Sequence, residues 1–237
     1  MDMNMQGLPD WVQPIATVFV TLSVLTALAV AYDIYGRGYR QRSASIEGVW
    51  IISGLWLGPF ALPLYARAGR SRTTKWQAQH APDQELGLAA ESASGSLPGA
   101  AASTISHVLA VPFVLATGLS LFGVPMYAMI VIILVLAIAM LWAFEYSTAN
   151  RRKVGGMSVA TALVVATVTV LAFDLGMVGW MLVLHFTELL PAPGTVNFLF
   201  FMQIGNVLGF LAGLPVVAFL LARGLKPAGS RDQMAVA

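Results

Sequence analysis

The chain has 237 residues, of which 58% are hydrophobic and 10% charged, and its mean hydropathy is +0.77. Soluble domains carry about 25% charged residues, so this composition excludes a protein whose surface faces water throughout. The net charge of +2 does not suggest nucleic acid as a partner, and the absence of cysteine excludes disulfides and thiol chemistry.

Six apolar stretches follow one another along the chain. They comprise residues 15–32, 49–66, 105–122, 124–144, 158–190 and 196–222. A transmembrane helix needs about 20 apolar residues, with a range of about 17–25. The sequence therefore predicts an all-α fold, a polytopic membrane helix bundle of about six transmembrane helices, with the lipid bilayer as its surroundings.

Composition also divides the chain into four predicted regions. Residues 1–66 hold the first two apolar helices, and residues 67–103 are polar and rich in Gly, Ser and Ala, as flexible linkers are. Residues 104–226 form a four-helix membrane domain, with a tight turn at 123–125 between its first two helices. Residues 227–237 are predicted to be a disordered tail.

The orientation of the chain in the membrane is predicted from its 13 Lys and Arg, which gather in short clusters beside the apolar stretches. Six full spans, the favoured interpretation, place most of these clusters in the cytoplasm. In the alternative, residues 49–66 dip into the bilayer and return, which Gly54, Gly58, Pro59 and Pro63 would suit. Both interpretations predict a multi-pass protein of the bacterial inner membrane with a cytoplasmic linker and C-terminus.

The sharpest functional candidate is Asp174, about 16 residues into the fifth stretch and so roughly 24 Å along the helix axis. Ionisable groups inside a membrane are costly and are a hint of function. A carboxyl group buried there takes up a proton or binds a cation. The alternative is a hydrogen bond to Gln203 or Asn206 on the last helix, which would hold the two helices together.

Helical periodicity predicts that five residues lie on one face of this helix: Asp174, Met177, Met181, His185 and Glu188. Thioether and imidazole groups suit Cu(I), so a ladder of Met177, Met181 and His185 could hold copper. The alternative is that the methionines only pack in the core. No cofactor is otherwise expected. His185 and Glu188 are interpreted as a pH-responsive pair near the outer surface. His107, in the third stretch, is a further candidate metal ligand.

The last stretch carries Gly205, Gly209 and Gly213 at four-residue spacing, which lets helices approach closely. This face could hold a homo-oligomer or a hetero-oligomer together. Glu145, at the end of the fourth stretch, is expected to form an ion pair with the cations at 151–153. No enzyme motif is found, so nothing supports a catalytic function.

Three passages resemble a family of bacterial multi-pass membrane proteins known as domain of unknown function 4396. They are YDIYGRGYRQR with EGVWIISGLWLGPFALPLYARAGR, then AFDLGMVGWMLVLHF, then FFMQIGNVLGFLAGLPVVAFLLARGLK. The resemblance implies a His-Cys pair, a second Cys and an Asp in the third helix. Here His107 keeps the His position, but Val108, Pro112 and Ala116 replace the others, so any thiol chemistry of the family is lost.

These observations favour a transporter-like protein that handles protons or ions, with Asp174 as the protonatable or cation-binding group and His185 and Glu188 controlling access. The first alternative is a non-catalytic membrane subunit or assembly partner that uses the glycine face. The second alternative is a metal-binding membrane protein.

Overall fold

The computed structural model describes residues 8–80, 86–150 and 156–226, and its long elements are all helices. Six helical segments in this part of the chain are long and apolar enough to cross a membrane. They are Val12–Gly36, Ala44–Arg72, Leu88–Thr117, Pro125–Asn150, Val159–Phe186 and Val196–Ala222. The predicted all-α membrane fold is therefore confirmed, and the chain is a multi-pass membrane protein. The predicted tail at 227–237 lies outside the described residues.

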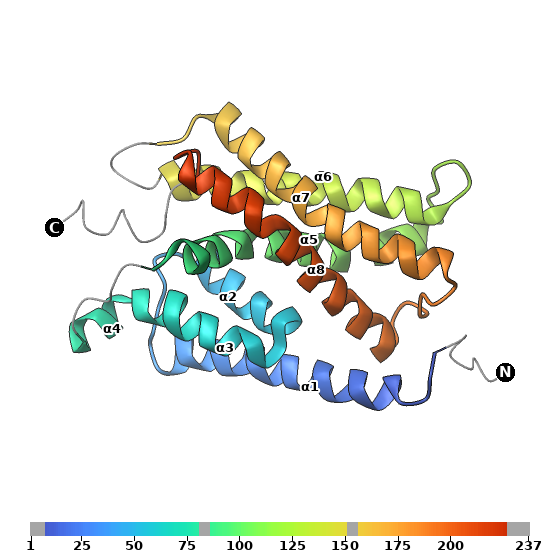
Figure 1. Cartoon of the computed structure of the whole chain (residues 1–237), viewed down its shortest axis with the longest axis horizontal. Helices are drawn as coiled ribbons and strands as arrows, with labels where there is room; N and C mark the ends of the chain where they lie inside the picture. The colour runs from blue at the N-terminus through green and yellow to red at the C-terminus, as the bar shows by residue number, and fades with distance from the viewer. Residues whose placement is uncertain (1–7, 81–85, 151–155, 227–237) are drawn as a thin grey trace. The chain divides into compact units, whose positions relative to one another are not determined.

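The first two apolar segments are each built from several helical pieces (Figure 1). Helix α1 (Val12–Ala31) continues into a π-helical turn, Tyr32–Gly36. The second segment consists of α2 (Ala44–Leu57), a 3-10 turn, α3 (Ala61–Leu64), a second π-helical turn and a second 3-10 turn, and α4 (Thr74–Gln79) follows it. The remaining segments are single helices: α5 (Leu88–Thr117), α6 (Pro125–Asn150), α7 (Val159–Phe186) and α8 (Val196–Ala222).

Contacts between these elements divide the chain into two units. The first unit is Met1–Gln84 with Gly176–Gly209, and the second is Glu85–Leu175 with Phe210–Ala237. Helices α7 and α8 therefore each contribute one part to each unit. Large apolar side chains remain exposed on every candidate span, as expected for surfaces that face lipid: Val18, Phe60, Phe113, Val135, Leu175 and Phe219.

In the first unit, α2 packs closely against α1. A Cβ on Gly54 would lie 2.9 Å from the backbone nitrogen of Ala27, so a larger residue could not fit between these helices. Gly58 then ends α2 with a φ of +56°, which L-residues rarely adopt. This position is also crowded, because a Cβ on Gly58 would lie 3.0 Å from the hydroxyl oxygen of Ser23. The helix therefore breaks where a side chain is excluded.

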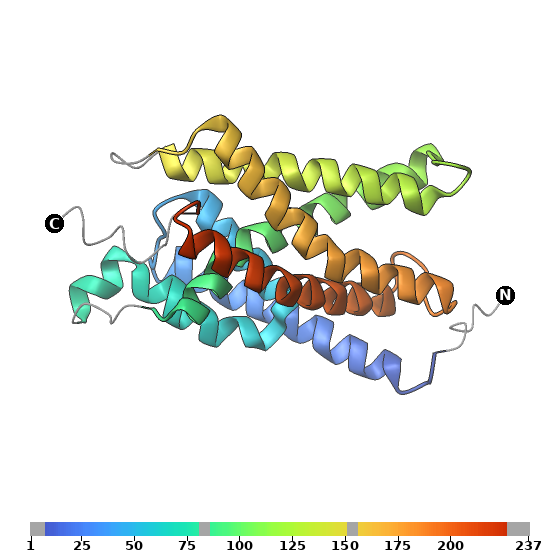
Figure 2. The ribbon, with the colours of Figure 1, turned by 45° about the horizontal axis from the view of Figure 1, so that its top comes forward.

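After this break the chain turns back on itself (Figures 1 and 2). The rings of Trp50 and Tyr65 lie 5.5 Å apart, and the Gln41 amide donates to the Gly69 carbonyl at 3.3 Å. On one straight helix, residues 50 and 65 would be about 22 Å apart. Ala44–Arg72 is thus a helical hairpin whose two ends meet, as in the interpretation in which this segment dips and returns. Its first arm, α2, is about 21 Å long, against about 30 Å for the hydrocarbon core.

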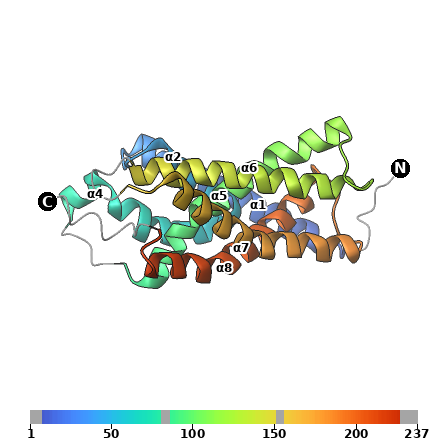
Figure 3. The same ribbon diagram turned by 90° about the horizontal axis from the view of Figure 1, so that it is seen from above.

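In the second unit, α5 and α6 form the predicted helical hairpin (Figure 3). Backbone hydrogen bonds between Leu121 and Val124 close the turn in both directions, at 2.9 and 3.3 Å. Phe122 and Gly123 between them have φ values of 51° and 76°. Two central residues with positive φ are the signature of a tight type I′ turn, which reverses the chain in the fewest residues.

The first half of α5 differs from the flexible linker expected over 67–103. This helix begins at Leu88, and its Ser96, Leu97 and Ala100 are buried. Further along the chain, Ala102 joins a buried cluster with Ala137, Leu141, Ala166 and Val170. Small residues allow such close helix packing, but they also give a segment the composition of a linker. Composition alone therefore does not distinguish a closely packed helix from a flexible linker in this segment.

A buried ion pair fastens the end of α8 to α6 within the second unit. The Lys226 ammonium contacts the Glu145 carboxylate, and each side chain is 5% exposed. Glu145 thus pairs with Lys226, and the cations at 151–153, with which an ion pair was expected, lie outside the described residues. Neither charge is left unpaired in the low-dielectric interior, where an unpaired charge would be strongly destabilising.

Candidate functional site

Asp174 lies on α7, about 22 Å from the first residue of this apolar helix. The residue is 8% exposed, and its Oδ1 has no hydrogen-bond partner among the described residues. Its helix neighbours Ala172 and Phe173 are also buried, whereas Leu175 is 79% exposed. One face of the helix is therefore enclosed by protein, and the carboxyl group lies on that face.

The stripe that was predicted to run from Asp174 to Glu188 ends earlier. Helix α7 stops at Phe186, and Glu188 has a φ of 59°, so it lies beyond the helix in the left-handed region. The Leu189 N–H donates to the Leu184 carbonyl at 2.9 Å, which closes the helix end in a Schellman arrangement. Glu188 is therefore not one helical turn below His185. The Glu188 N–H donates to the His185 carbonyl at 3.2 Å, and both side chains are exposed.

The two predicted polar partners lie on the first-unit part of α8. Gln203 donates from Nε2 to the Leu55 carbonyl at 2.6 Å, near the tip of the hairpin, while its Oε1 is buried without a hydrogen-bond partner in the described structure. Asn206 is buried as well, and it has an interaction partner. Asp174 belongs to the second unit, so its pairing with either residue stays a prediction.

Most of the glycine face of α8 is used for packing inside the chain. A Cβ on Gly205 would lie 3.1 Å from the Met177 sulfur and 3.1 Å from the Trp180 ring. A Cβ on Gly176 of α7 would lie 2.7 Å from the Gly209 nitrogen, so the two backbones nearly touch there. A Cβ on Gly213, by contrast, would meet no heavy atom within 4 Å.

The candidate metal ligands lie in unlike surroundings. Met177 is fully buried against Gly205, Met181 is half-buried and His185 is exposed. His107 donates from Nδ1 to the Ser103 carbonyl at 2.8 Å, which ties its ring to its own helix. Among residues 8–80, 86–150 and 156–226, no group of three or more His, Asp or Glu could hold a metal ion. The copper ladder stays a prediction, and for Met177 packing accounts for its position.

The model of a family described as domain of unknown function (DUF4396) matches residues 90–226. The chain belongs to the DUF4396 family. No curated protein and no solved structure matches it.

The DUF4396 match includes Asp174, His185 and the glycine face of α8, but it begins after the helical hairpin. Membership therefore confirms the resemblance for the two passages that lie within residues 90–226, without supplying an activity. It also leaves the most highly charged part of the structure, residues 33–76, outside the matched segment.

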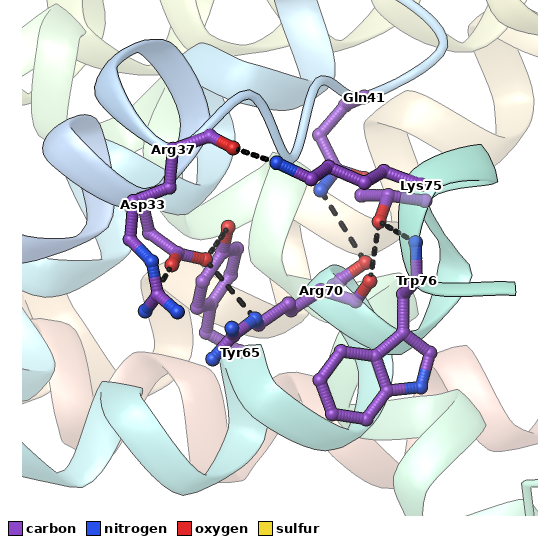
Figure 4. Close-up of polar contacts among 9 residues, drawn as sticks. Asp33, Arg37, Gln41, Tyr65, Arg70, Lys75 and Trp76 are labelled. Atoms are coloured by element: carbon purple, nitrogen blue, oxygen red, sulfur yellow. Dashed lines mark hydrogen bonds and ion pairs between the residues drawn. The ribbon is translucent and has the colours of Figure 1, made fainter. Parts of the chain in front are cut away.

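That part contains a buried carboxylate that the sequence analysis did not single out, Asp33 (Figure 4). It is 8% exposed, and its Oδ2 accepts a hydrogen bond from the Tyr65 hydroxyl at 3.0 Å. Arg37 approaches Oδ1 at 3.1 Å, and Arg70 approaches Oδ2 at 3.5 Å. Asp33 and Tyr65 each lie in one of the two π-helical turns, a distortion that is frequent at functional sites.

A second buried carboxylate, Glu47, is paired in the same region. Arg40 donates to both of its oxygens, at 2.6 and 3.0 Å, and the Gln41 N–H donates to it at 3.1 Å. Glu47 is 1% exposed. Hydrogen bonding to this carboxylate raises the pKa of Arg40 above its ordinary value. The loop between the first two apolar segments is thereby fixed to the start of α2.

Cations also surround the buried ring of Tyr39 in this loop. The Arg70 guanidinium lies 4.1 Å from the ring centroid, Lys75 Nζ lies 4.9 Å away and the Arg37 guanidinium 5.5 Å away. The Arg70 guanidinium, and next the positive charges of Arg37 and Lys75, lower the pKa of the Tyr39 hydroxyl. We call Arg37, Tyr39, Arg70 and Lys75 the cationic cluster.

Proposed function

We propose that this DUF4396 protein is a transporter-like membrane protein that handles protons or another cation through Asp174. The observation that carries the proposal is the buried carboxyl group whose Oδ1 lacks a hydrogen-bond partner in the described part of the chain. An ionised carboxylate without partners is costly in such surroundings, so the group favours a bound proton or a bound cation. Loss and recovery of that cation would be the elementary step.

Access to Asp174 is proposed to pass the end of α7. His185 and Glu188 are exposed there, and His185 is about 16 Å from Asp174 along the helix axis. A positive charge on the His185 imidazole would change the local potential for an approaching cation. The carboxylate of Glu188 would attract the same cation at the surface. The bacterial inner membrane remains the proposed location.

The test is cation flux in liposomes that contain the purified protein. Imposed gradients of protons, Na⁺ and K⁺ are followed separately with internal dyes. We expect at least one gradient to dissipate faster than in empty liposomes, and Asp174→Asn to return that rate to the empty-liposome level.

Asp10→Asn is the matched control, because it makes the same chemical change at an exposed position. Thermal unfolding and size exclusion of both variants separate a lost function from a lost fold. Flux through folded Asp174→Asn at the wild-type rate would contradict the proposal.

A second candidate function is that of an assembly partner that binds another membrane protein through α8. It is supported by the four-residue glycine spacing of α8: Gly205 and Gly209 pack within the chain, whereas a Cβ on Gly213, which is itself buried, would meet no heavy atom within 4 Å. We expect Gly213→Leu to remove a larger complex from blue-native gels without unfolding the protein. A complex that persists in this variant argues against α8 as the interface.

A further inference from the structure

The hairpin gathers positive charge at one end of the first unit. Seven Lys and Arg lie between residues 37 and 75, whereas Asp33 and Glu47 are the two acids between residues 33 and 76. The hydrogen bond from Gln41 to the Gly69 carbonyl joins the two ends of the hairpin. Lys75 Nζ also donates to the Arg37 carbonyl. Cations separated by more than 30 residues in sequence are thus brought together.

The charges of the cationic cluster are only partly compensated. Asp33 contacts Arg37 and Arg70, but Glu47 is engaged by Arg40, and the described structure gives Lys75 no carboxylate partner. Three cations within 5.5 Å of one ring centroid repel one another, even though the ring itself attracts each of them. An additional anion would relieve this repulsion.

Unpaired donors point to the same conclusion. Two guanidinium nitrogens of Arg72 and the indole Nε1 of Trp76 are buried without a hydrogen-bond partner in the described residues. All three atoms can donate, and none can accept. Buried polar groups are normally satisfied, so this segment lacks acceptors. An ionised phosphate group has oxygens that accept and no O–H that donates, and it pairs well with guanidinium groups.

The position along the chain identifies the source of such a phosphate. The first candidate span ends at Gly36 and the second at Arg72, so the cluster lies at the ends of two apolar segments. Lipid headgroups occupy this level of a bilayer, and basic residues beside membrane helices attract anionic lipids. We propose that the cationic cluster binds the phosphate group of an anionic phospholipid headgroup.

Within the site the cations have different tasks. Arg70 lies 4.1 Å from the Tyr39 centroid and 5.1 Å from that of Trp76, so its guanidinium is held between two rings. Its side chain is 22% exposed, whereas that of Arg37 is 50% exposed and Lys75 is exposed too. Arg37 and Lys75 therefore form the open edge that meets the phosphate. Removing the Lys75 charge leaves every contact of Asp33 intact.

The experiment is a titration of the full-length protein in an uncharged detergent. Short-chain phosphatidylglycerol, short-chain phosphatidylcholine and inorganic phosphate are added separately, and native mass spectrometry counts the molecules retained. We expect phosphatidylglycerol to bind more tightly than the other two. Lys75→Gln should weaken its binding about five-fold, since one cation near a membrane surface contributes about a factor of this size.

Two variants make the result specific. Lys75→Arg keeps the charge and should restore binding, whereas Arg42→Gln removes an exposed charge from the loop between the first two apolar segments and should change it little. Equal losses in Lys75→Gln and Arg42→Gln would mean diffuse attraction only and would overturn the site. Tighter binding of inorganic phosphate than of phosphatidylglycerol would overturn the lipid as its source.

Discussion

Asp33 and Asp174 are both 8% exposed, but the surroundings of the two carboxyl groups differ. Asp33 receives a tyrosine hydroxyl and two guanidinium groups, whereas Oδ1 of Asp174 has no hydrogen-bond partner in the described residues. Burial alone therefore does not reveal what an acid does. We interpret Asp33, which is held by fixed charges, as an acid that serves the architecture, and the function proposed for Asp174 rests on the partner that its Oδ1 lacks among the described residues.

The comparison depends on the hairpin, because only a chain reversal brings Tyr65 and Arg70 to Asp33. The chain has no cysteine, so single cysteines can be introduced without further changes. We expect Ser45→Cys and Thr74→Cys to react with an impermeant maleimide from the same side of the membrane. Asp10→Cys, at the other end of α1, should react from the opposite side. Labelling of Ser45→Cys and Thr74→Cys from different sides would show a full span instead.

Removing the paired acid should have the largest effect on stability. Asp33→Ala leaves Arg37, Arg70 and the Tyr65 hydroxyl without their shared acceptor. Breaking a buried ion pair from one side costs about 3–5 kcal/mol, and the partial exposure of Arg37 places this case at about 3 kcal/mol. The free energy of unfolding in detergent measures the loss. A change below about 1 kcal/mol would show that the arginines do not depend on Asp33.

Tyr65→Phe tests one contact of the same acid and should have a smaller effect. It removes the hydroxyl that donates to Asp33 at 3.0 Å but keeps the ring that packs on Trp50. Hydrogen bonds to charged groups contribute about 1.5–3 kcal/mol, and Arg37 and Arg70 remain, so we expect a loss of about 1.5 kcal/mol. Unfolding of Trp50→Phe, measured in parallel, reports the packing contribution by itself.

The smallest effect on stability is expected for Asp174→Asn. An amide has nearly the same shape and carries no charge, so the variant removes a desolvation cost without emptying space. We expect the free energy of unfolding to stay within about 1 kcal/mol of the wild type. A loss as large as that of Asp33→Ala would mean that Asp174 is a structural acid as well, and the contrast between the two residues would disappear.

The helices were predictable wherever a stretch of apolar residues ends in polar ones. The last span begins at Val196 and ends at Ala222, as its sequence indicates. Prediction failed where small residues have two meanings: Gly, Ser and Ala in the first half of α5 pack helices together, although the same residues make up linkers. It also failed at Glu188, since helical periodicity does not show that α7 stops at Phe186.

The candidate residues show the same division. Asp174 was singled out from the sequence because an acid in the middle of an apolar stretch is visible without any structure. Asp33 was missed because it stands beside Arg37 at the edge of a stretch, where charged residues are ordinary topology signals. A useful signal would have been the acids at 33 and 47 among seven cations, since their partners Arg40 and Arg70 could then have been sought.

The amino-acid sequence by itself determined that this is a multi-pass helical membrane protein with an acid inside its fifth apolar stretch. These properties depend on composition and on local periodicity, which each segment carries independently of the others. Only the tertiary structure decided that the second segment folds back at Gly58 and that Tyr65 and Arg70 meet Asp33. Such contacts join residues more than 30 positions apart, and no local pattern specifies which distant partner a buried charge finds.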